Sequence, residues 1–141
     1  MRIEEEIQQK TFKSEYHKLA VNIIFTHGWL TSLQRSLFDK FSITVNQYNI
    51  LRILRGQHPN PISVNLLKER MLDKMSDTSR LVERLRTKGL VERKICKNDR
   101  RKSDVKVTSK GLELLAELEP IDLEVERTLK ALSKDEAETL N

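Results

Sequence analysis

The sequence is poor in glycine, proline and cysteine. Its 141 residues include four glycines, three prolines and one cysteine, whereas leucine, glutamate, lysine and arginine are abundant. Glycine and proline mark the turns of β-rich domains, so their scarcity argues against a β-sandwich. The abundant residues all favour helices. We therefore expect a mainly α fold in which long helices are joined by short connections.

The chain also lacks the features of several functional classes. The single cysteine, Cys96, cannot form an internal disulfide, and three scattered histidines do not complete a zinc site. No apolar run approaches the roughly 20 residues needed to cross a bilayer, and residues 1–6 are acidic, unlike a signal peptide. No phosphate-binding glycine loop or acid–base spacing is recognisable. We expect a cytoplasmic protein that is not an enzyme and holds no metal or other cofactor.

Positive charge collects in one stretch of the chain. Residues 68–110 carry 15 Lys/Arg against 7 Asp/Glu, residues 1–58 carry 8 against 5, and residues 111–141 carry 3 against 9. The three net charges are therefore +8, +3 and −6. A local excess of this kind is expected of a phosphate-binding surface, although a solvated face gives the same pattern. The motifs inside the stretch have to decide between these interpretations.

Apolar residues at helical spacing predict one long helix from about Glu6 to Phe38. A helix of about 30 residues usually buries part of itself against a second subunit as well as its own core. It therefore favours a dimer, with packing inside a monomer as the alternative. The apolar stripe consists of Leu19, Ile23, Leu30, Leu33 and Leu37, broadened by Ile24, Phe25, Trp29 and Phe38.

Two shorter helices are predicted next. Thr44-Val45-Asn46-Gln47 has the form of a capping box, and the helix that it opens stops near Gly56, before two prolines. Ser63 is the expected N-cap of the following helix, which ends near residues 73–74.

Ser76 is the expected N-cap of a fourth helix, and Gly89 follows the end of that helix. The helix has two different faces. Its inward face consists of Thr78, Leu81, Val82 and Leu85, and its outward face of Ser79, Arg80, Glu83, Arg84, Arg86 and Thr87.

Beyond Gly89 the pattern changes from helical to alternating. Residues 90–96 and 104–108 are predicted to be antiparallel strands, with residues 97–103 as a basic turn. Thr108 or Ser109 then caps a helix that Pro120 should kink or restart. Ser133 opens a last helix of only about two turns. So short a terminal helix indicates that the segment stops before the helix is complete.

Two helices joined by a tight turn and followed by a basic hairpin form the order of a winged helix-turn-helix. Hydroxyl and guanidinium groups at the start of the second helix suit the major groove, where they can bond phosphates and base edges. Arginines at a narrow hairpin tip suit the minor groove, whose negative potential attracts guanidinium groups. The predicted DNA-binding set is Ser76, Asp77, Ser79, Arg80, Arg84, Arg100, Arg101 and Lys102.

Four segments together carry a resemblance to a known family: residues 76–85, 88–93, 99–101 and 107–111. They match a recognition helix, a Gly-Leu-Val start of the wing, an Asp-x-Arg wing motif and a Thr-x-x-Gly start of the next helix. In these motifs the chain resembles the MarR family of bacterial transcriptional regulators. The resemblance implies one domain over 1–141, with a winged-helix lobe at about 42–112 and dimerisation helices at about 6–38 and 113–141.

The resemblance also implies roles for single residues. Arg101 would enter the minor groove, and Asp99 would brace that arginine, unless Asp99 is an ordinary turn residue. Asp77 departs from expectation, because an acid near phosphate is unfavourable. It could accept a bond from a cytosine amine or stabilise the helix N-terminus. The resemblance implies that four residues face the major groove: Ser76, Ser79, Arg80 and Arg84. For the two arginines, the alternative is a solvated helix surface.

Two further features are open to a functional interpretation. His17, His27 and Trp29 could line the pocket in which similar regulators bind phenolic or aromatic ligands, or they could pack in the core or at an interface. Cys96 could sense oxidants, but on a strand it is more often a passive small residue.

Taken together, the sequence predicts a homodimeric, ligand-responsive repressor that binds a pseudo-palindromic DNA site, one subunit to each half. Two alternatives stay open. One is a winged-helix module that binds another protein, and the other is an architectural protein that binds DNA without sequence preference.

Overall fold

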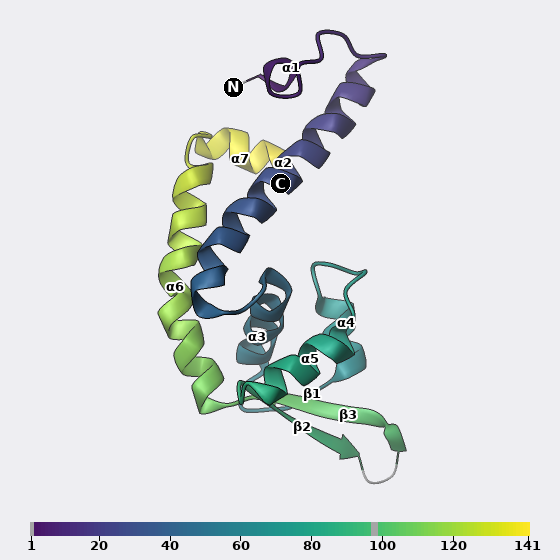
Figure 1. The fold of residues 1–141 in the computed structure, drawn as a ribbon, viewed down its shortest axis with the longest axis vertical. Coiled ribbons are helices and arrows are strands. Elements are labelled where there is room, and N and C mark those ends of the chain that lie inside the picture. Colours follow the sequence, from purple (N-terminus) through teal and green to yellow (C-terminus); the bar gives the residue numbers. More distant parts are fainter. Residues whose placement is uncertain (1, 97–98) are drawn as a thin grey trace. The chain divides into compact units, whose positions relative to one another are not determined.

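The computed structural model describes residues 2–96 and 99–141, and the side chains of residues 95, 96 and 99–102 lie outside this description (Figure 1). The chain divides into two compact units, one extending to Leu37 and the other spanning Phe38–Asn141. Each unit is described by itself.

The N-terminal unit contains two helices instead of the one predicted. Helix α1 spans Ile3–Glu6 and α2 spans Glu15–Phe38, so the prediction of a continuous helix from Glu6 is wrong at its N-terminal end. Gln8 adopts a left-handed conformation with φ of 53°, which interrupts the helix. The Ser14 hydroxyl then accepts a hydrogen bond from the His17 amide at 3.1 Å, which is how a new helix begins.

Helix α2 leaves part of its apolar stripe exposed within the single chain, whereas Phe25, Leu30, Leu33 and Leu37 are half-buried. Its only buried residue is Phe38, at its last position. Leu19, Ile23 and Ile24 are 56%, 62% and 72% exposed. An amphipathic helix normally buries such side chains, so this surface is unusual for an isolated subunit.

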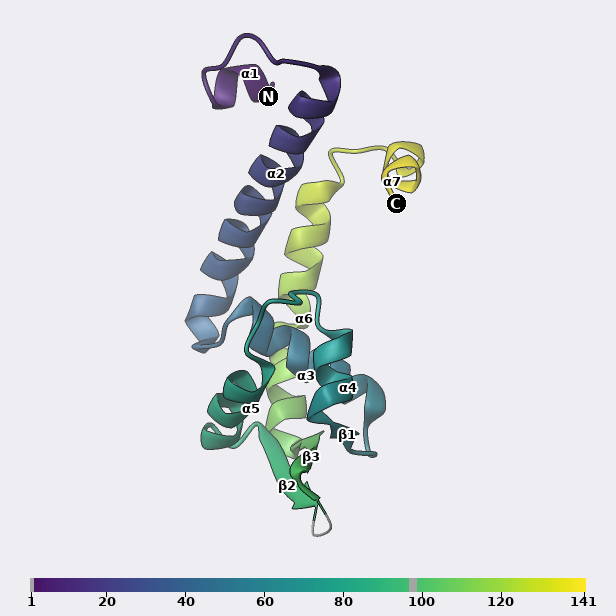
Figure 2. The ribbon, with the colours of Figure 1, turned by 90° about the vertical axis from the view of Figure 1, so that its right-hand side faces the viewer.

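The second unit is a winged helix with two added C-terminal helices. Helices α3, α4 and α5 contact one another and the three-stranded sheet, as Figures 1 and 2 show. This confirms the predicted mainly α fold with a small β-hairpin. Its elements in chain order are η1 (Asp39–Phe41), α3 (Val45–Gln57), β1 (Ile62–Ser63), α4 (Val64–Arg70), α5 (Thr78–Thr87), β2 (Val91–Cys96), β3 (Asp99–Val107), α6 (Ser109–Leu129) and α7 (Lys134–Leu140).

Local capping explains why most of these helices begin where they do. The Thr44–Gln47 capping box is present at the start of α3, with the reciprocal bonds at 3.2 and 3.0 Å. Ser63, Thr108 and Ser133 cap α4, α6 and α7 as predicted. Helix α4 ends at Arg70, before the predicted position, because Met71 has extended backbone angles.

The sheet has the antiparallel order β1-β3-β2. The sequence does not reveal β1, because two residues are too few to show alternation. The predicted turn over residues 97–103 is wrong from Asp99 on, since β3 begins at Asp99 and pairs with β2 at Asp99 and Ser103, whereas residues 97–98 lie outside the described residues. Polar residues on a projecting hairpin need no apolar alternation, so the pattern that predicts strands is absent there.

The core of this unit lies around α3, which packs against α4, α5, α6 and β3. Helix α6 contributes Leu115, Leu118 and Ile121 to it and continues through Pro120, so of the kink or restart expected at this proline the restart is wrong. Buried Leu118 and Ile121 hold α6 on the core on both sides of Pro120. The most deeply buried side chains include Ile50, Leu51 and Leu54 of α3, Leu67 of α4, Val82 and Leu85 of α5, and Val105 of β3.

Candidate nucleic-acid interface

Helix α5 begins one residue later than the sequence suggests, and this changes the role of Asp77. The Ser76 hydroxyl donates to the Asp73 carbonyl at 2.8 Å, so the prediction of Ser76 as N-cap is wrong. Asp77 is the N-cap, and its Oδ1 accepts the Arg80 amide at 3.0 Å. The carboxylate satisfies an otherwise free amide and complements the positive end of the helix. The acid that seemed out of place therefore has a structural function.

The two faces of α5 are separated as predicted. Thr78, Val82 and Leu85 are buried, whereas Leu81 is half-buried. Ser79, Arg80 and Arg84 lie exposed on the outer face. Burial of the inner face fixes the helix, so the exposed side chains are presented from a rigid support.

The arginines of α5 differ in their availability. Arg86 donates three hydrogen bonds to the Glu83 carboxylate at 2.7–3.1 Å, and this contact lowers the pKa of Glu83. Within the described part of the chain, the guanidinium groups of Arg80 and Arg84 make no hydrogen bond or ion pair. Arg80 and Arg84 are therefore free to contact a phosphate or a base, whereas Arg86 is already engaged.

The turn that precedes α5 is held by α3, through contacts that the sequence did not suggest. The Asn46 side chain donates to Asp73 at 2.9 Å, and Asn49 accepts the Leu72 amide at 3.0 Å. These bonds join residues more than 20 positions apart, so no local pattern could have predicted them. They fix the start of α5 relative to the core.

The C-terminal end of α5 is held by the first turn of α6. Thr108 donates its hydroxyl proton to the Gly89 carbonyl at 2.8 Å, and Lys110 donates to the Lys88 carbonyl at 3.1 Å. A Cβ atom on Gly111 would lie 2.3 Å from the Leu90 carbonyl oxygen, so only glycine allows this close approach. The Thr-x-x-Gly motif thus has a tertiary role, because it anchors the C-terminal end of α5.

The wing is a hairpin of β2 and β3 that projects from the lobe (Figures 1 and 2). Arg93 donates to the Ser103 hydroxyl at 3.0 Å, and Lys106 pairs with Glu92 at 3.2 Å across the strands. The backbone of residues 99–102 belongs to β3, but the side chains of Asp99, Arg100, Arg101 and Lys102 lie outside the described residues, as does that of Cys96.

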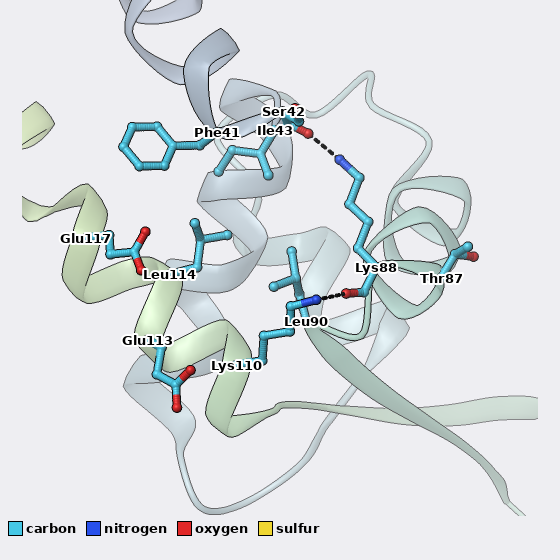
Figure 3. A pocket seen from close by; sticks show the side chains of 10 residues that line it. All are labelled: Phe41, Ser42, Ile43, Thr87, Lys88, Leu90, Lys110, Glu113, Leu114 and Glu117. Carbon is cyan, nitrogen blue, oxygen red and sulfur yellow. Dashed lines mark hydrogen bonds between the residues drawn. The ribbon is translucent and has the colours of Figure 1, made fainter.

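A shallow cavity of about 640 Å³ lies between the loop after η1, the end of α5 and the start of α6 (Figure 3). Phe41, Ile43, Leu90 and Leu114 form its apolar part. The sequence-predicted ligand residues His17, His27 and Trp29 do not line it. They lie exposed on α2.

A helical pair with a free cationic face, followed by a β-hairpin, defines a winged helix-turn-helix protein. Comparison with known proteins gives the family. A model of the MarR family matches residues 41–102. A MarR transcription factor from Planctomyces limnophilus is 30% identical, with a TM-score of 0.74 and coverage of 92% of this chain and 95% of that one. The chain belongs to the MarR family of transcriptional regulators.

Two other similar proteins have more specific descriptions. The HTH-type transcriptional repressor IacR of Pseudomonas putida is 26% identical over 116 residues, which cover 82% of this chain and 68% of that protein. Sco3205 of Streptomyces coelicolor, a MarR family regulator solved in complex with DNA, shares the fold with a TM-score of 0.78 at 20% identity. That alignment covers 94% of this chain and 85% of Sco3205. No helix in the described ranges is long and apolar enough to span a membrane.

Proposed function

We propose that this regulator is a repressor that binds a pseudo-palindromic DNA site as a homodimer, with one α5 helix in the major groove of each half-site. The observation that carries the proposal is the outer face of α5, where Arg80 and Arg84 are exposed and unengaged within the described structure. Ser79 lies beside them and can donate to a phosphate. The wing arginines Arg100 and Arg101 would reach the adjacent minor groove.

The repressor direction is supported by the similarity to IacR, whose name describes a transcriptional repressor. Dimer formation is supported by the exposed apolar stripe of α2. It is also supported by Leu123, Leu129 and Leu132 at the C-terminal end, which are 56%, 44% and 40% exposed. Two-fold symmetry of the protein requires a two-fold repeated site, which is why a pseudo-palindrome is expected.

A titration of duplex DNA at two salt concentrations tests DNA binding. The full-length protein is titrated into labelled DNA from around its own gene and into unrelated DNA. Binding should be tighter to the former and should weaken steeply with salt, because each phosphate contact releases counterions. If no duplex is bound, or if salt has no effect, the protein-binding alternative is favoured. If both DNAs bind equally, the architectural alternative is favoured.

A response to a small ligand belongs to the same proposal. His17, His27 and Trp29 lie on the exposed surface of α2, where a ligand could alter a dimer contact. Trp29 is the only tryptophan of the chain, so its fluorescence reports directly on that surface. Phenolic and aromatic compounds that change this fluorescence should also release the DNA. Compounds that release the DNA without changing the Trp29 fluorescence would indicate a ligand site elsewhere.

A further inference from the structure

Three side chains join α3 to α6 through a single carboxylate oxygen. The Tyr48 hydroxyl donates to Asp122 Oδ2 at 2.8 Å, and Arg52 donates to the same oxygen at 2.5 Å. Arg52 also donates to the Tyr48 hydroxyl oxygen at 3.2 Å. We call this group the Tyr48–Arg52–Asp122 cluster. Among the described residues, the only other side-chain hydrogen bond between α3 and α6 is Arg55 to Glu119, at 3.5 Å.

On the α3 side of the cluster, Tyr48 is packed in the core. Tyr48 is only 9% exposed, and its ring packs on Phe38 with the ring centres 4.6 Å apart. Burial raises the pKa of Tyr48 above its ordinary value, so its hydroxyl stays protonated and can donate to Asp122. The Arg52 guanidinium lies over the same ring, 5.7 Å from its centre. Two donors on α3, the Tyr48 hydroxyl and the Arg52 guanidinium, therefore face α6.

The cluster lies at the point where α6 leaves the core. The last buried residue of α6 is Ile121, directly before Asp122. Beyond it α6 carries Leu123 and Leu129, both exposed. Packing of the apolar face holds α6 against α3 but allows small rotations and shifts. Directional bonds to one oxygen atom restrict those movements at the exit point.

We propose that the Tyr48–Arg52–Asp122 cluster sets the half-site spacing that the dimer accepts, by fixing the direction in which α6 leaves the winged-helix lobe. The inference rests on the proposed function, since it requires two lobes on two half-sites. In such a dimer, the exposed part of α6 leads toward the partner, while α5 of the same lobe contacts DNA. The angle between lobe and α6 then determines the distance between the two recognition helices.

DNA makes this distance measurable. One inserted base pair moves a half-site by about 3.4 Å and rotates it by about 35°, so a rigid dimer cannot match both spacings. Cluster residues act here as positioning residues that contact no base. Arg52 and Asp122 are each 44% exposed, so their pairing adds little to folding stability and variants should remain folded.

The experiment measures spacing preference. The tightest duplex is first selected from random-sequence DNA by the full-length protein, and versions with one base pair added or removed at the centre are then compared with it. The parent protein should lose about tenfold or more in affinity on the altered spacings, because base contacts of one half are broken. The ratio of the affinity for the selected spacing to that for an altered spacing should be at least about threefold smaller in Asp122→Ala than in the parent protein. Tyr48→Phe should lower this ratio less, because Arg52 still holds Asp122.

Glu124→Ala is the matched control. It removes the same charge two residues further along α6, but its partner is Arg127 of the same helix, at 3.8 Å. It should leave the spacing ratio unchanged. Affinity for a duplex with one half-site should be equal in all variants, since binding to a single half-site does not depend on the spacing.

The outcomes separate the inference from the function on which it rests. An unchanged ratio in Asp122→Ala, or an equal change in Glu124→Ala, overturns the role of the cluster while DNA binding stands. A parent protein that binds DNA without any spacing preference also overturns it. If the parent protein selects no two-half-site duplex, the proposed function fails and the inference with it.

Discussion

At the scale of single residues, the arginines of α5 divide into free and engaged groups. Arg86 is held by Glu83, whereas Arg80 and Arg84 have no partner in the described structure. We predict that Arg80→Ala or Arg84→Ala weakens binding by about 1–3 kcal/mol where the side chain reads a base, or lowers the salt slope by about 1 where it contacts phosphate.

Arg86→Ala is the internal control on the same helix, with the same loss of charge. Its effect on affinity should be the smallest of the three, because releasing Glu83 does not remove a DNA contact. Fluorescence anisotropy with the selected duplex measures all three at several salt concentrations. A larger loss for Arg86→Ala than for the other two would contradict the assignment of the outer face.

At the scale of the element, Asp77 connects the stability of the recognition helix with its charge. Asp77→Ala removes the cap on the Arg80 amide and should lower the free energy of unfolding by about 1 kcal/mol. Asp77→Asn keeps an oxygen that can accept this bond, so it should stay near the parent stability. It also removes a negative charge near phosphate, so it should bind DNA more tightly at low salt.

Urea unfolding at one fixed protein concentration measures the first effect, since the stability of a dimer depends on concentration. The DNA titration measures the second. Equal stability in both variants would show that the cap contributes nothing. Weaker DNA binding by Asp77→Asn would instead support contact between Asp77 and a cytosine amine.

At the scale of the whole molecule, the exposed stripe of α2 predicts association. Ile23, 62% exposed in the single chain, should be buried in the dimer. We predict that Ile23→Glu converts the protein from a dimer to a monomer at micromolar concentration. In the dimer the glutamate charge would be buried, which is costly, whereas in the free subunit it stays in water. DNA affinity should fall strongly, because one subunit retains only one half-site.

Light scattering gives the solution mass of both forms. Ser32→Glu adds the same charge to an exposed position of α2 that lies about half a turn around the helix from Leu19, Ile23 and Leu30, and should remain dimeric. A parent protein that is monomeric at micromolar concentration would exclude the dimer. Loss of the dimer in both variants would show that charge, rather than position, is responsible.

Much of the fold could be predicted because its signals are local. Four residues cap helices by accepting the amide three residues further on, so each start can be recognised in a short window: Thr44, Ser63, Thr108 and Ser133. Where two signals compete, the window is ambiguous. Ser76 and Asp77 are both good caps, and the Asp73 carbonyl engages the Ser76 hydroxyl and leaves Asp77 to cap α5.

The sequence by itself determined the helical class, the order of recognition helix and wing, and the residues of the outer α5 face. These follow from side-chain periodicity and local capping, which act over a few residues. Tertiary structure alone decided which arginines are free, how Thr108 and Gly111 anchor α5, and where Tyr48 and Arg52 meet Asp122. Those contacts join positions about 20 to more than 70 residues apart, and their geometry depends on how the helices pack, which no local pattern contains.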